Sequence, residues 1–550
     1  MPAFFAPRRL ARVGAALFGC ALVMLGAACS KVGTSTQQLH GNRSTIHGVV
    51  RLAIIAEPNT LNPVLSGLIQ EGYMEAAIFD GLIMLDNHAN IIPDLATVVP
   101  SLANGGISPD GKTITYHLRH GVTWQDGAPF TSADVAFTYQ TYVNPKVNTF
   151  YTAIYQHITS VSTPDPYTVV LHLKAPYAPA LIQFFERGTG GFVIPKHILE
   201  KSSDINTDPF GKHPIGTGPF RLERWDHGSL LLLKANPRYF NGAPKVGEVD
   251  VRIVANPNTQ LEMVGSHELD VAAQLVPAQY SQIQQTAGIR AVLVPSLLER
   301  FLTFNMRHQP FGDIRVRRAL SLALDRNRIV QTAYAGTSTL AQTLIPPAGW
   351  AYDPTGAPAY DPAAARALLD SAGWIVGPDG LRAKNGRALS FVLLNQTESN
   401  PLSTMAQEIQ RAWRDLGVAA DLRFVPRNVI YGNPGLATDG KFDALVDDWG
   451  ADPDPDRSFM IETKSFAPQA YNDAFYSDPE VDLWSEEATA TYDLTQRKAS
   501  YSKIQRRLNR DLPYLPLVWE GRIYAVNTDL LNFLPEPVFS DFWNAQQWQI

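Results

Sequence analysis

Cysteine is almost absent from this chain of 550 residues. The two cysteines are Cys20 and Cys29, so residues 30–550 contain no thiol. This absence excludes a disulfide framework, a cysteine nucleophile and a thiolate metal site from everything that follows Cys29. The stability and the chemistry of the main part of the chain therefore depend on core packing and on other side chains.

The apolar run near the start of the chain is too short to span a bilayer. Residues 13–28 are 16 uncharged residues, whereas a spanning helix needs about 20. A basic segment that contains Arg8, Arg9 and Arg12 precedes this run, which is typical of an export signal. We therefore expect residues 1–28 to be a signal peptide.

The end of this leader predicts a lipid anchor. The sequence Gly26-Ala27-Ala28-Cys29 resembles the lipobox at which bacterial lipoproteins are cleaved and lipidated on the new N-terminal cysteine. Leu25 lies four residues before Cys29, where the usual lipobox has it three before, and "LFGC" at Cys20 is the alternative. The competing interpretation is an inert Cys29 in a cleaved peptide. Residues 29–48 are polar and rich in Gly, Ser and Thr, which predicts a flexible tether behind the lipidated Cys29.

An excess of basic residues is also missing. Without the leader, 43 basic and 52 acidic residues remain, a net charge of −9 with histidine neutral. Nucleic-acid-binding domains carry a basic patch or stripe. The charge therefore argues against a nucleic acid as partner.

The stretch "GISPDGKT", Gly106 to Thr113, matches the pattern of a phosphate-binding loop but lacks its context. A working loop follows a buried strand, leads into a helix and offers free backbone N–H groups. Here Pro109 removes one donor and Asp110 would repel a phosphate, while the following "TITYHLR" alternates like a half-buried strand. We predict a hairpin turn with Gly111 at positive φ and no nucleotide.

Patterns of catalysis or metal binding are missing as well. The chain contains neither HExxH nor GxSxG. Three aspartates at 452, 454 and 456 have the spacing of a calcium loop, but Arg457 stands where that loop requires glycine. We expect no catalytic residue, no metal and no cofactor.

Strand-like and helix-like segments are mixed from Val49 onward. Examples are "VVRLAII" and "YTVVLHL" for strands, and "DPAAARALLDSAG" for a helix with Asp361 as N-cap and Pro362 as its first residue. The mixture predicts α/β or α+β domains, and the length predicts two or three of them.

Longer motifs carry a specific resemblance. The segment "DGKTITYHLRHGVTWQDGAPFTSADVAFTY", from Asp110, resembles the signature of the family 5 extracellular solute-binding proteins, the oligopeptide- and dipeptide-binding subunits of ABC importers. Further motifs in family order are "EPNTLNP" at Glu57, "PIGTGPFRLERWDHG" at Pro214, "NPRYFNGAPKV" at Asn236, "FNMRHQPFGDIRVRRALSLALDRNRIV" at Phe304, "YDPAAARALLDSAGW" at Tyr360 and "LPYLPLVW" at Leu512. They cover essentially the whole mature chain.

The resemblance implies a two-lobed α/β fold of the periplasmic-binding-protein type (type II, cluster C), with an additional α+β domain inserted in the first lobe. The implied boundaries are 49–70, 200–295 and 506–550 for lobe I, 71–199 for the additional domain and 296–505 for lobe II. Such proteins are not enzymes. They capture a peptide or other small solute and deliver it to an ABC permease complex. The resemblance and the leader together predict a monomer in the periplasm or cell envelope, held at a membrane by its lipid anchor.

The resemblance also indicates a ligand site in "DDWGADPDPD", from Asp447. In peptide-binding relatives an aspartate shortly after a tryptophan here pairs with the α-amino group of the peptide, and Asp452, three residues after Trp449, matches it. A carboxylate suits this task because its hydrogen bond to an ammonium group is charge-assisted. The segment is one residue shorter than the common W-x-A-D-x-x-D-P form, so Asp454 is the alternative. An acidic surface loop without a ligand is the competing interpretation.

Three further candidates carry two interpretations each. Trp449 lines the pocket or packs beneath the loop. Glu57 contacts the ligand main chain or lies at the surface where a strand ends, and Asn305 belongs to a hinge or a cleft wall at the start of lobe II or is structural. Nickel complexes, oligosaccharides and opines are alternative solutes, because the scaffold does not fix the solute. A ligand-sensing receptor without transport is the alternative from another class.

Overall fold

The computed structural model describes residues 42, 44–189, 191–397, 400–538 and 540–550. The predicted signal peptide, Cys29 and most of the predicted tether lie outside these residues. Near the end of that tether, Asn42 N–H and Thr45 Oγ1 each donate to Asp529 Oδ2 over 2.5 Å. Within the described part of the chain, no helix has the length and apolar character that crossing a membrane requires.

A large mixed sheet organises the fold. Its strands are β1 (Val49–Ile54), β7 (Phe220–Asp226), β8 (Leu230–Ala235), β9 (Glu248–Ile253), β10 (Val271–Leu275), β11 (Ile289–Phe304), β12 (Thr339–Leu340), β16 (Ser390–Gln396), β17 (Ala419–Val425), β18 (Ala444–Gly450) and β19 (Tyr514–Asn527). They lie in the order β17, β16, β18, β11, β19, β10, β1, β9, β8, β7, and β12 pairs with β19. Parallel pairs, such as β1 with β9 and β16 with β17, occur at both ends, and antiparallel pairs join them in the middle.

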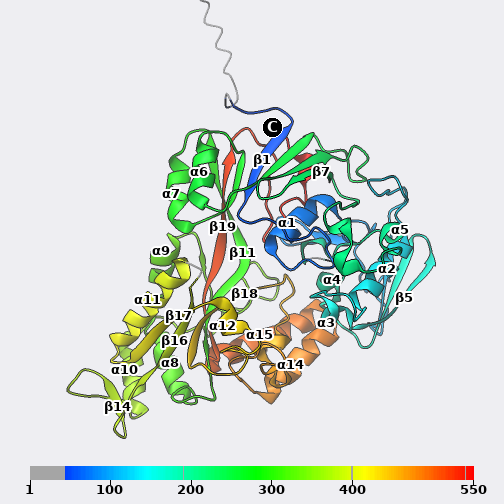
Figure 1. Ribbon diagram of the computed structural model, residues 1–550. Helices are drawn as coiled ribbons and strands as arrows, with labels where there is room; N and C mark the ends of the chain where they lie inside the picture. The colour runs from blue at the N-terminus through cyan, green and yellow to red at the C-terminus, as the bar shows by residue number, and fades with distance from the viewer. Residues whose placement is uncertain (1–41, 43, 190, 398–399, 539) are drawn as a thin grey trace, which may run out of the picture. The chain divides into compact units, whose positions relative to one another are not determined.

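Two long strands link the two ends of this sheet. β11 and β19 are antiparallel over almost their whole length and run side by side in Figure 1. The C-terminal part of β19 pairs with β10. The C-terminal part of β11 pairs with β18. Their register shifts between Pro295 and Glu299, so the ladder is irregular where the predicted lobes meet.

The segments around lobe I hold the helices α1 (Ile69–Ile78), α6 (Pro257–Gly265) and α7 (Tyr280–Gln285). The predicted additional domain contains β2 (Ile83–Leu85), β3 (Ile91–Pro93), β4 (Thr113–His117), β5 (Ile158–Asp165), β6 (Thr168–Leu173), α2 (Ser132–Tyr142), α3 (Thr152–Tyr155), α4 (Ala180–Gln183) and α5 (Lys196–Leu199). Strands β4, β6 and β5 form a separate antiparallel sheet. Helix α2 begins with a capping box, because Asp134 accepts the N–H of Thr131 and Thr131 accepts the N–H of Ala133.

The predicted turn at "GISPDGKT" is confirmed. Ser108 N–H donates to Thr113 O over 3.0 Å, and Gly111 has φ +67°. Thr113 then begins the strand β4, where a phosphate-binding loop would need a helix. The exposed Lys112 therefore has no phosphate cradle around it.

The predicted lobe II, 296–505, contains or begins most of the remaining helices. They are α8 (Ile314–Leu322), α9 (Arg326–Tyr334), α10 (Pro362–Ser371), α11 (Asn400–Arg414), α12 (Arg427–Tyr431), α13 (Ser458–Ile461), α14 (Pro479–Ala490) and α15 (Leu494–Asp511). A small sheet comprises β13 (Ile375–Val376), β14 (Arg382–Lys384) and β15 (Arg387–Ala388). The predicted cap of α10 is confirmed, since Asp361 Oδ1 accepts the N–H of Ala364 over 2.9 Å and Pro362 is the first helical residue.

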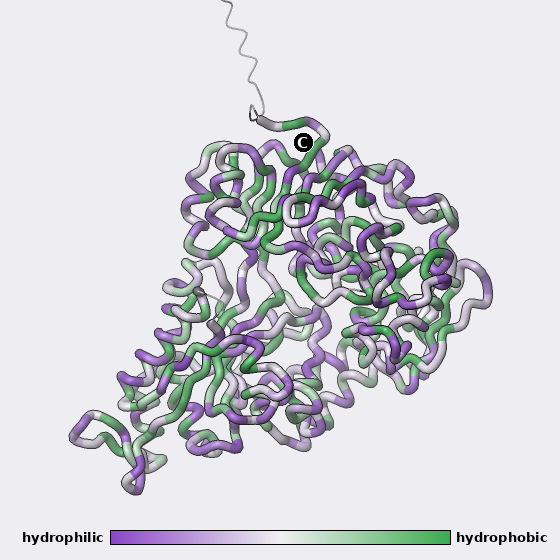
Figure 2. The backbone as a smooth tube through the Cα atoms, viewed as in Figure 1, coloured by the Kyte–Doolittle hydropathy of each residue, from purple (hydrophilic) through white to green (hydrophobic). Residues whose placement is uncertain are grey.

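The hydrophobic cores follow these groups of elements. The segments predicted as lobe I and as the additional domain share one core, in which Val50 and Ile114 are both fully buried. Lobe II has its own core around residues such as Trp413. Figure 2 shows hydrophobic stretches along the sheet strands and hydrophilic stretches mainly in peripheral segments. A smaller group, here called the junction cluster, combines residues from all three predicted regions: Leu85, Ile182, Leu297, Ala341, Ala451, Trp519 and Val538.

Candidate ligand-binding site

The loop between β18 and α13 carries the three aspartates of the sequence motif. Asp454 is held by Arg497 of α15, whose Nη2 lies 2.8 Å from both carboxylate oxygens. Both side chains are 5% exposed. Arg497 Nε also donates to Ala488 O over 2.9 Å. This buried pair fixes the loop on the helix and leaves Asp454 no free oxygen for a ligand.

The side chain of Asp456 forms a hydrogen bond with the backbone. Its Oδ1 accepts the N–H of Ser458, the first residue of α13, over 2.9 Å. Burial raises the pKa of Asp456 to about 6, and the hydrogen bond from Ser458 opposes this rise. The carboxyl group of Asp456 is therefore engaged by the backbone at the point where α13 begins.

Asp452 is held less tightly than its two neighbours. It is half-buried, and no lysine, arginine or histidine nitrogen among the described residues lies within 4.0 Å of its carboxylate. Burial raises the pKa of Asp452 to about 6, while the charge of Arg457 opposes the rise. A desolvated carboxyl group without a bound cation gains most from a cation that a ligand brings.

An aromatic cluster of Trp449, Phe459 and Tyr471 adjoins this loop. The ring of Trp449 lies 4.9 Å from that of Phe459 and 4.8 Å from that of Tyr471, measured between centroids. Tyr471 is 54% exposed, and Trp449 and Phe459 are half-buried. Trp449 thus packs against other rings and still keeps part of its surface accessible.

Glu57 and Asn305 have their polar atoms engaged within the protein. Glu57 accepts hydrogen bonds from Trp225 Nε1 over 2.8 Å and from Gly228 N–H over 3.0 Å, and it pairs with His227. Burial opposes them, but these hydrogen bonds together lower the pKa of Glu57. The geometry ties Glu57 to the hairpin of β7 and β8.

Asn305 is fully buried. Its Nδ2 donates to Gly440 O over 3.0 Å and to Phe442 O over 2.9 Å, and its Oδ1 accepts the N–H of Arg307. With both ends of the amide occupied by backbone groups, Asn305 joins the end of β11 to the segment before β18.

Glu299 is a buried acid that the sequence did not single out. It lies in β11 directly between Trp449 of β18 and Trp519 of β19, and it is 1% exposed. Glu299 Oε1 and Trp519 Nε1 have no hydrogen-bond partner among the described residues. Burial raises the pKa of Glu299 to about 8, and the charge of Arg457 opposes this. This rise favours the protonated form of Glu299, and nothing in its sequence context indicated it.

The next residue, Arg300, begins a polar network on the sheet. Its guanidinium bonds to Asp448, and its Nε donates to Glu520 Oε1 over 2.7 Å. Arg427 of α12 also contacts Asp448, over 2.8 Å. The network joins β11, β18 and β19 through charge-assisted hydrogen bonds.

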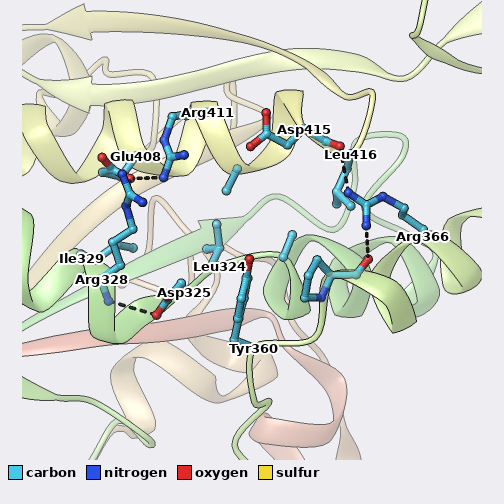
Figure 3. A pocket seen from close by; sticks show the side chains of 13 residues that line it. Leu324, Asp325, Arg328, Ile329, Tyr360, Arg366, Glu408, Arg411, Asp415 and Leu416 are labelled. Carbon is cyan, nitrogen blue, oxygen red and sulfur yellow. Dashed lines mark hydrogen bonds and ion pairs between the residues drawn. The ribbon is translucent and has the colours of Figure 1, made fainter.

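A separate hollow of about 190 Å³ lies between α9, α10 and α11 (Figure 3). Arg328 and Arg411 both donate to Glu408 in this hollow, and Arg366 donates to the backbone oxygens of Pro362 and Asp415. None of the five residues predicted to bind ligand lines it. The hollow is therefore not the site that the sequence indicated.

The fold and the loop together define a class of protein. Two α/β lobes joined by paired strands, with a half-buried carboxylate and aromatic rings where the parts meet, are the architecture of a solute-binding protein. Ligands of such proteins are held between domains that close on them.

Comparison with known proteins places the chain within that class. Residues 97–470 match the family described as bacterial extracellular solute-binding proteins, family 5 Middle. Protein XP55 of Streptomyces lividans is 31% identical over 87% of this chain and 84% of its own length. The glutathione-binding protein GsiB of Salmonella typhimurium is 28% identical over 88% of this chain and 91% of its own. The crystal structure of NikZ from Campylobacter jejuni in complex with Ni(L-His) superposes with a TM-score of 0.77 at 25% identity, covering 92% of this chain and all of NikZ.

The chain belongs to the family 5 bacterial extracellular solute-binding proteins, the substrate-binding subunits of ABC importers. The predicted membership of this family and the predicted two-lobed α/β fold are thereby confirmed. Proteins of this family bind solutes outside the cytoplasmic membrane and deliver them to permeases.

Proposed function

We propose that this chain is a lipid-anchored binding protein that captures peptides by their free amino group and delivers them to an ABC permease. Asp452 is the residue that pairs with the ammonium group. Trp449, with the rest of the aromatic cluster, packs against the first part of the peptide. Glu57 and Asn305 hold the surrounding backbone in place.

One observation carries this proposal. Of the three aspartates in the loop, Asp454 is bound to Arg497 and Asp456 accepts the N–H of Ser458, whereas no cation of the described residues is paired with Asp452. A carboxylate that is partly desolvated before the ligand arrives loses little further hydration when the ligand binds. A peptide ammonium would supply both the missing charge and the hydrogen bonds.

The relatives are compatible with such a ligand. GsiB is a glutathione-binding protein, and glutathione is itself a peptide with a free amino group. NikZ holds a nickel complex of histidine, so a metal complex is the second candidate solute. A sensor without transport would use the same site, because Asp452 does not distinguish between the two classes.

Calorimetry with Asp452→Asn tests the peptide proposal. Leaving a bound ammonium unpaired costs about 2–5 kcal/mol, which is roughly thirty-fold or more in affinity. We expect Asp452→Asn to lose at least thirty-fold in affinity for a free-amino peptide. The melting temperature of the unliganded variant should not fall, since the substitution removes a carboxylate that burial destabilises.

Asp456→Asn is the matched control, because an asparagine can still accept the N–H of Ser458. We expect its peptide affinity to stay within about threefold of the original. Acetylating the amino group of the peptide should weaken binding to the unaltered protein and add little to the loss in Asp452→Asn. Equal affinity for free and acetylated peptides would remove Asp452 from the site. Mass spectrometry of the solute that co-purifies with the protein would then identify the alternative.

A further inference from the structure

Glu299 and two tryptophans form a row across the three strands that join the lobes. Glu299 of β11 is paired directly with Trp449 of β18 on one side and with Trp519 of β19 on the other. Directly opposed residues of antiparallel strands share one face of the sheet, with Cβ atoms about 4.5–5.5 Å apart. The side chain of Glu299 is therefore flanked by two indole side chains.

This acid lacks the partners that a buried charge requires. Glu299 is 1% exposed, and neither its Oε1 nor Trp519 Nε1 has a hydrogen-bond partner among the described residues. The next residue, Arg300, shows the contrast, because successive side chains of a strand point to opposite faces. On that other face Arg300 bonds to Asp448 and Glu520. Charge on Glu299 is thus far more costly than its uncharged form.

The row of three side chains borders the junction cluster. Trp519 belongs to this cluster, and Leu297, another member, lies two residues before Glu299. Ala451 N–H donates to Leu297 O over 2.7 Å. The ladder of β11 and β19 is irregular between Pro295 and Glu299. A change in the charge of Glu299 therefore acts where residues of all three predicted regions pack together.

We infer that Glu299 is a pH-sensitive positioning residue at the junction of the lobes. Its uncharged form packs with Trp449 and Trp519 and keeps β11, β18 and β19 together. Ionisation places an unpaired charge among these side chains, and the strands separate locally until water reaches the charge. Glu299 thus acts on binding through the position of Trp449, without touching the solute.

The groups around Glu299 determine the sign of this effect. On β11 Arg300 faces away, and β18 and β19 present the two tryptophans. Arg457, in the loop after β18, opposes the rise in the pKa of Glu299, while its Nε and Nη2 donate to Leu344 O over 3.2 and 3.1 Å. Burial prevails and raises the pKa of Glu299 from 4.5 to about 8. Since the folded-state pKa is the higher one, the stabilisation is complete below pH 4.5 and is lost as pH rises through about 8.

The indole N–H signal of Trp519 reports this ionisation directly. Nitrogen-15 labelling of the ten tryptophans in the full chain gives the indole spectrum, and Trp519→Phe identifies the signal by its loss. We expect the signal to shift with pH in the unaltered protein, with a midpoint at about 8. It should not shift in Glu299→Gln, because an amide does not titrate in this range.

Urea denaturation of the unliganded full chain measures the effect on stability. Between pH 5 and pH 8 the unfolded chain has lost the proton of Glu299, whereas the folded chain retains it. The unfolding constant of the unaltered protein should therefore rise relative to that of Glu299→Gln, by up to about tenfold per pH unit, and the difference should stay level above pH 8. Glu223→Gln is the control, since it alters a 42% exposed side chain of the same sheet. Its midpoint should follow that of the unaltered protein at every pH.

The effect on binding rests on the proposed function, because Trp449 belongs to the proposed site. Calorimetry with one free-amino peptide compares the unaltered protein with Glu299→Gln at pH 6 and at pH 9. Titration of the amino group of the peptide cancels in the ratio of the two affinities. We expect equal affinities at pH 6 and about fivefold weaker binding by the unaltered protein at pH 9.

Three results would overturn the inference. A Trp519 signal that stays in place between pH 6 and pH 9, or a difference in urea midpoint that does not vary with pH, would show that Glu299 does not ionise there. Equal affinities at pH 9, with both titrations as expected, would leave Glu299 a structural residue only. If Asp452→Asn leaves peptide affinity unchanged, the proposed function fails, while the indole signal and the urea midpoints, which need no solute, still support or refute the ionisation of Glu299.

Discussion

At the scale of residues, neighbours decide what identical side chains do. Asp452, Asp454 and Asp456 alternate along five residues of one loop, yet of the three only Asp454 meets a cation of the described residues at bonding distance. Arg497 lies in another helix far along the sequence, so no local pattern could show that it neutralises Asp454. The sequence predicted this loop as the site and left the choice between Asp452 and Asp454 open, and the geometry favours Asp452.

Breaking the pair of Asp454 and Arg497 should destabilise the protein strongly. Arg497→Met leaves a buried carboxylate without its cation, which costs about 3–5 kcal/mol. Urea denaturation should show this as a lower midpoint with an unchanged slope.

The pair of Arg423 and Asp421 is the control, because its side chains are 60% and 59% exposed. We expect Arg423→Met to change the free energy of unfolding by about 1 kcal/mol at most. Similar losses in the two variants would show that the buried pair contributes nothing particular to stability.

At the scale of elements, periodicity and capping signals predicted local structure well. The alternation in "TITYHLR" gave the strand β4, and Asp361 with Pro362 gave the start of α10. The sequence did not predict β11 as one strand from Ile289 to Phe304, because Pro295 lies inside it and a proline usually marks the end or edge of a strand. The order of strands in the sheet depends on contacts between segments that are distant in the sequence. It therefore could not be predicted from one sequence.

Substitutions at two adjacent residues of the turn "GISPDGKT" should differ in their effect on stability. Gly111 has φ +67°, and a Cβ there would meet Pro176 Cβ at 3.0 Å and the ring of Tyr492 at 3.2 Å. We expect Gly111→Ala to cost about 1–2 kcal/mol, since an L-residue is strained in this conformation.

Lys112→Ala, at the exposed next position, should change stability by no more than about 0.5 kcal/mol. Thermal unfolding of both variants checks the contrast. Saturable binding of ATP that Lys112→Ala abolishes would contradict the assignment as a turn.

At the scale of the whole molecule, the leader and the body have to act together. The body holds the solute, and the proposed lipid on Cys29 keeps it near a permease. Several acyl chains anchor a protein stably, whereas a single chain binds only marginally. We expect Cys29→Ser to move the protein from the membrane fraction to the soluble fraction, which quantitative fractionation measures.

A Lys31→Ala variant changes a residue beside the cysteine and should leave the distribution unaltered. If Cys29→Ser remains with the membrane because its leader is uncleaved, the anchor is the leader and the proposal of a lipoprotein is wrong. The same fractionation with Cys20→Ser decides between the two cysteines.

The central position of β19 has a consequence for how the protein is made. This strand lies between β11 and β10, yet its residues, Tyr514–Asn527, come after those of both neighbours in the sequence. A nascent chain that has reached Asp511 has both neighbouring strands with unpaired edges and nothing to join them. The two halves of the sheet therefore cannot unite through this strand until residues 514–527 have been made. A chain that still lacks them stays incompletely folded, which is the state that a threading export channel requires.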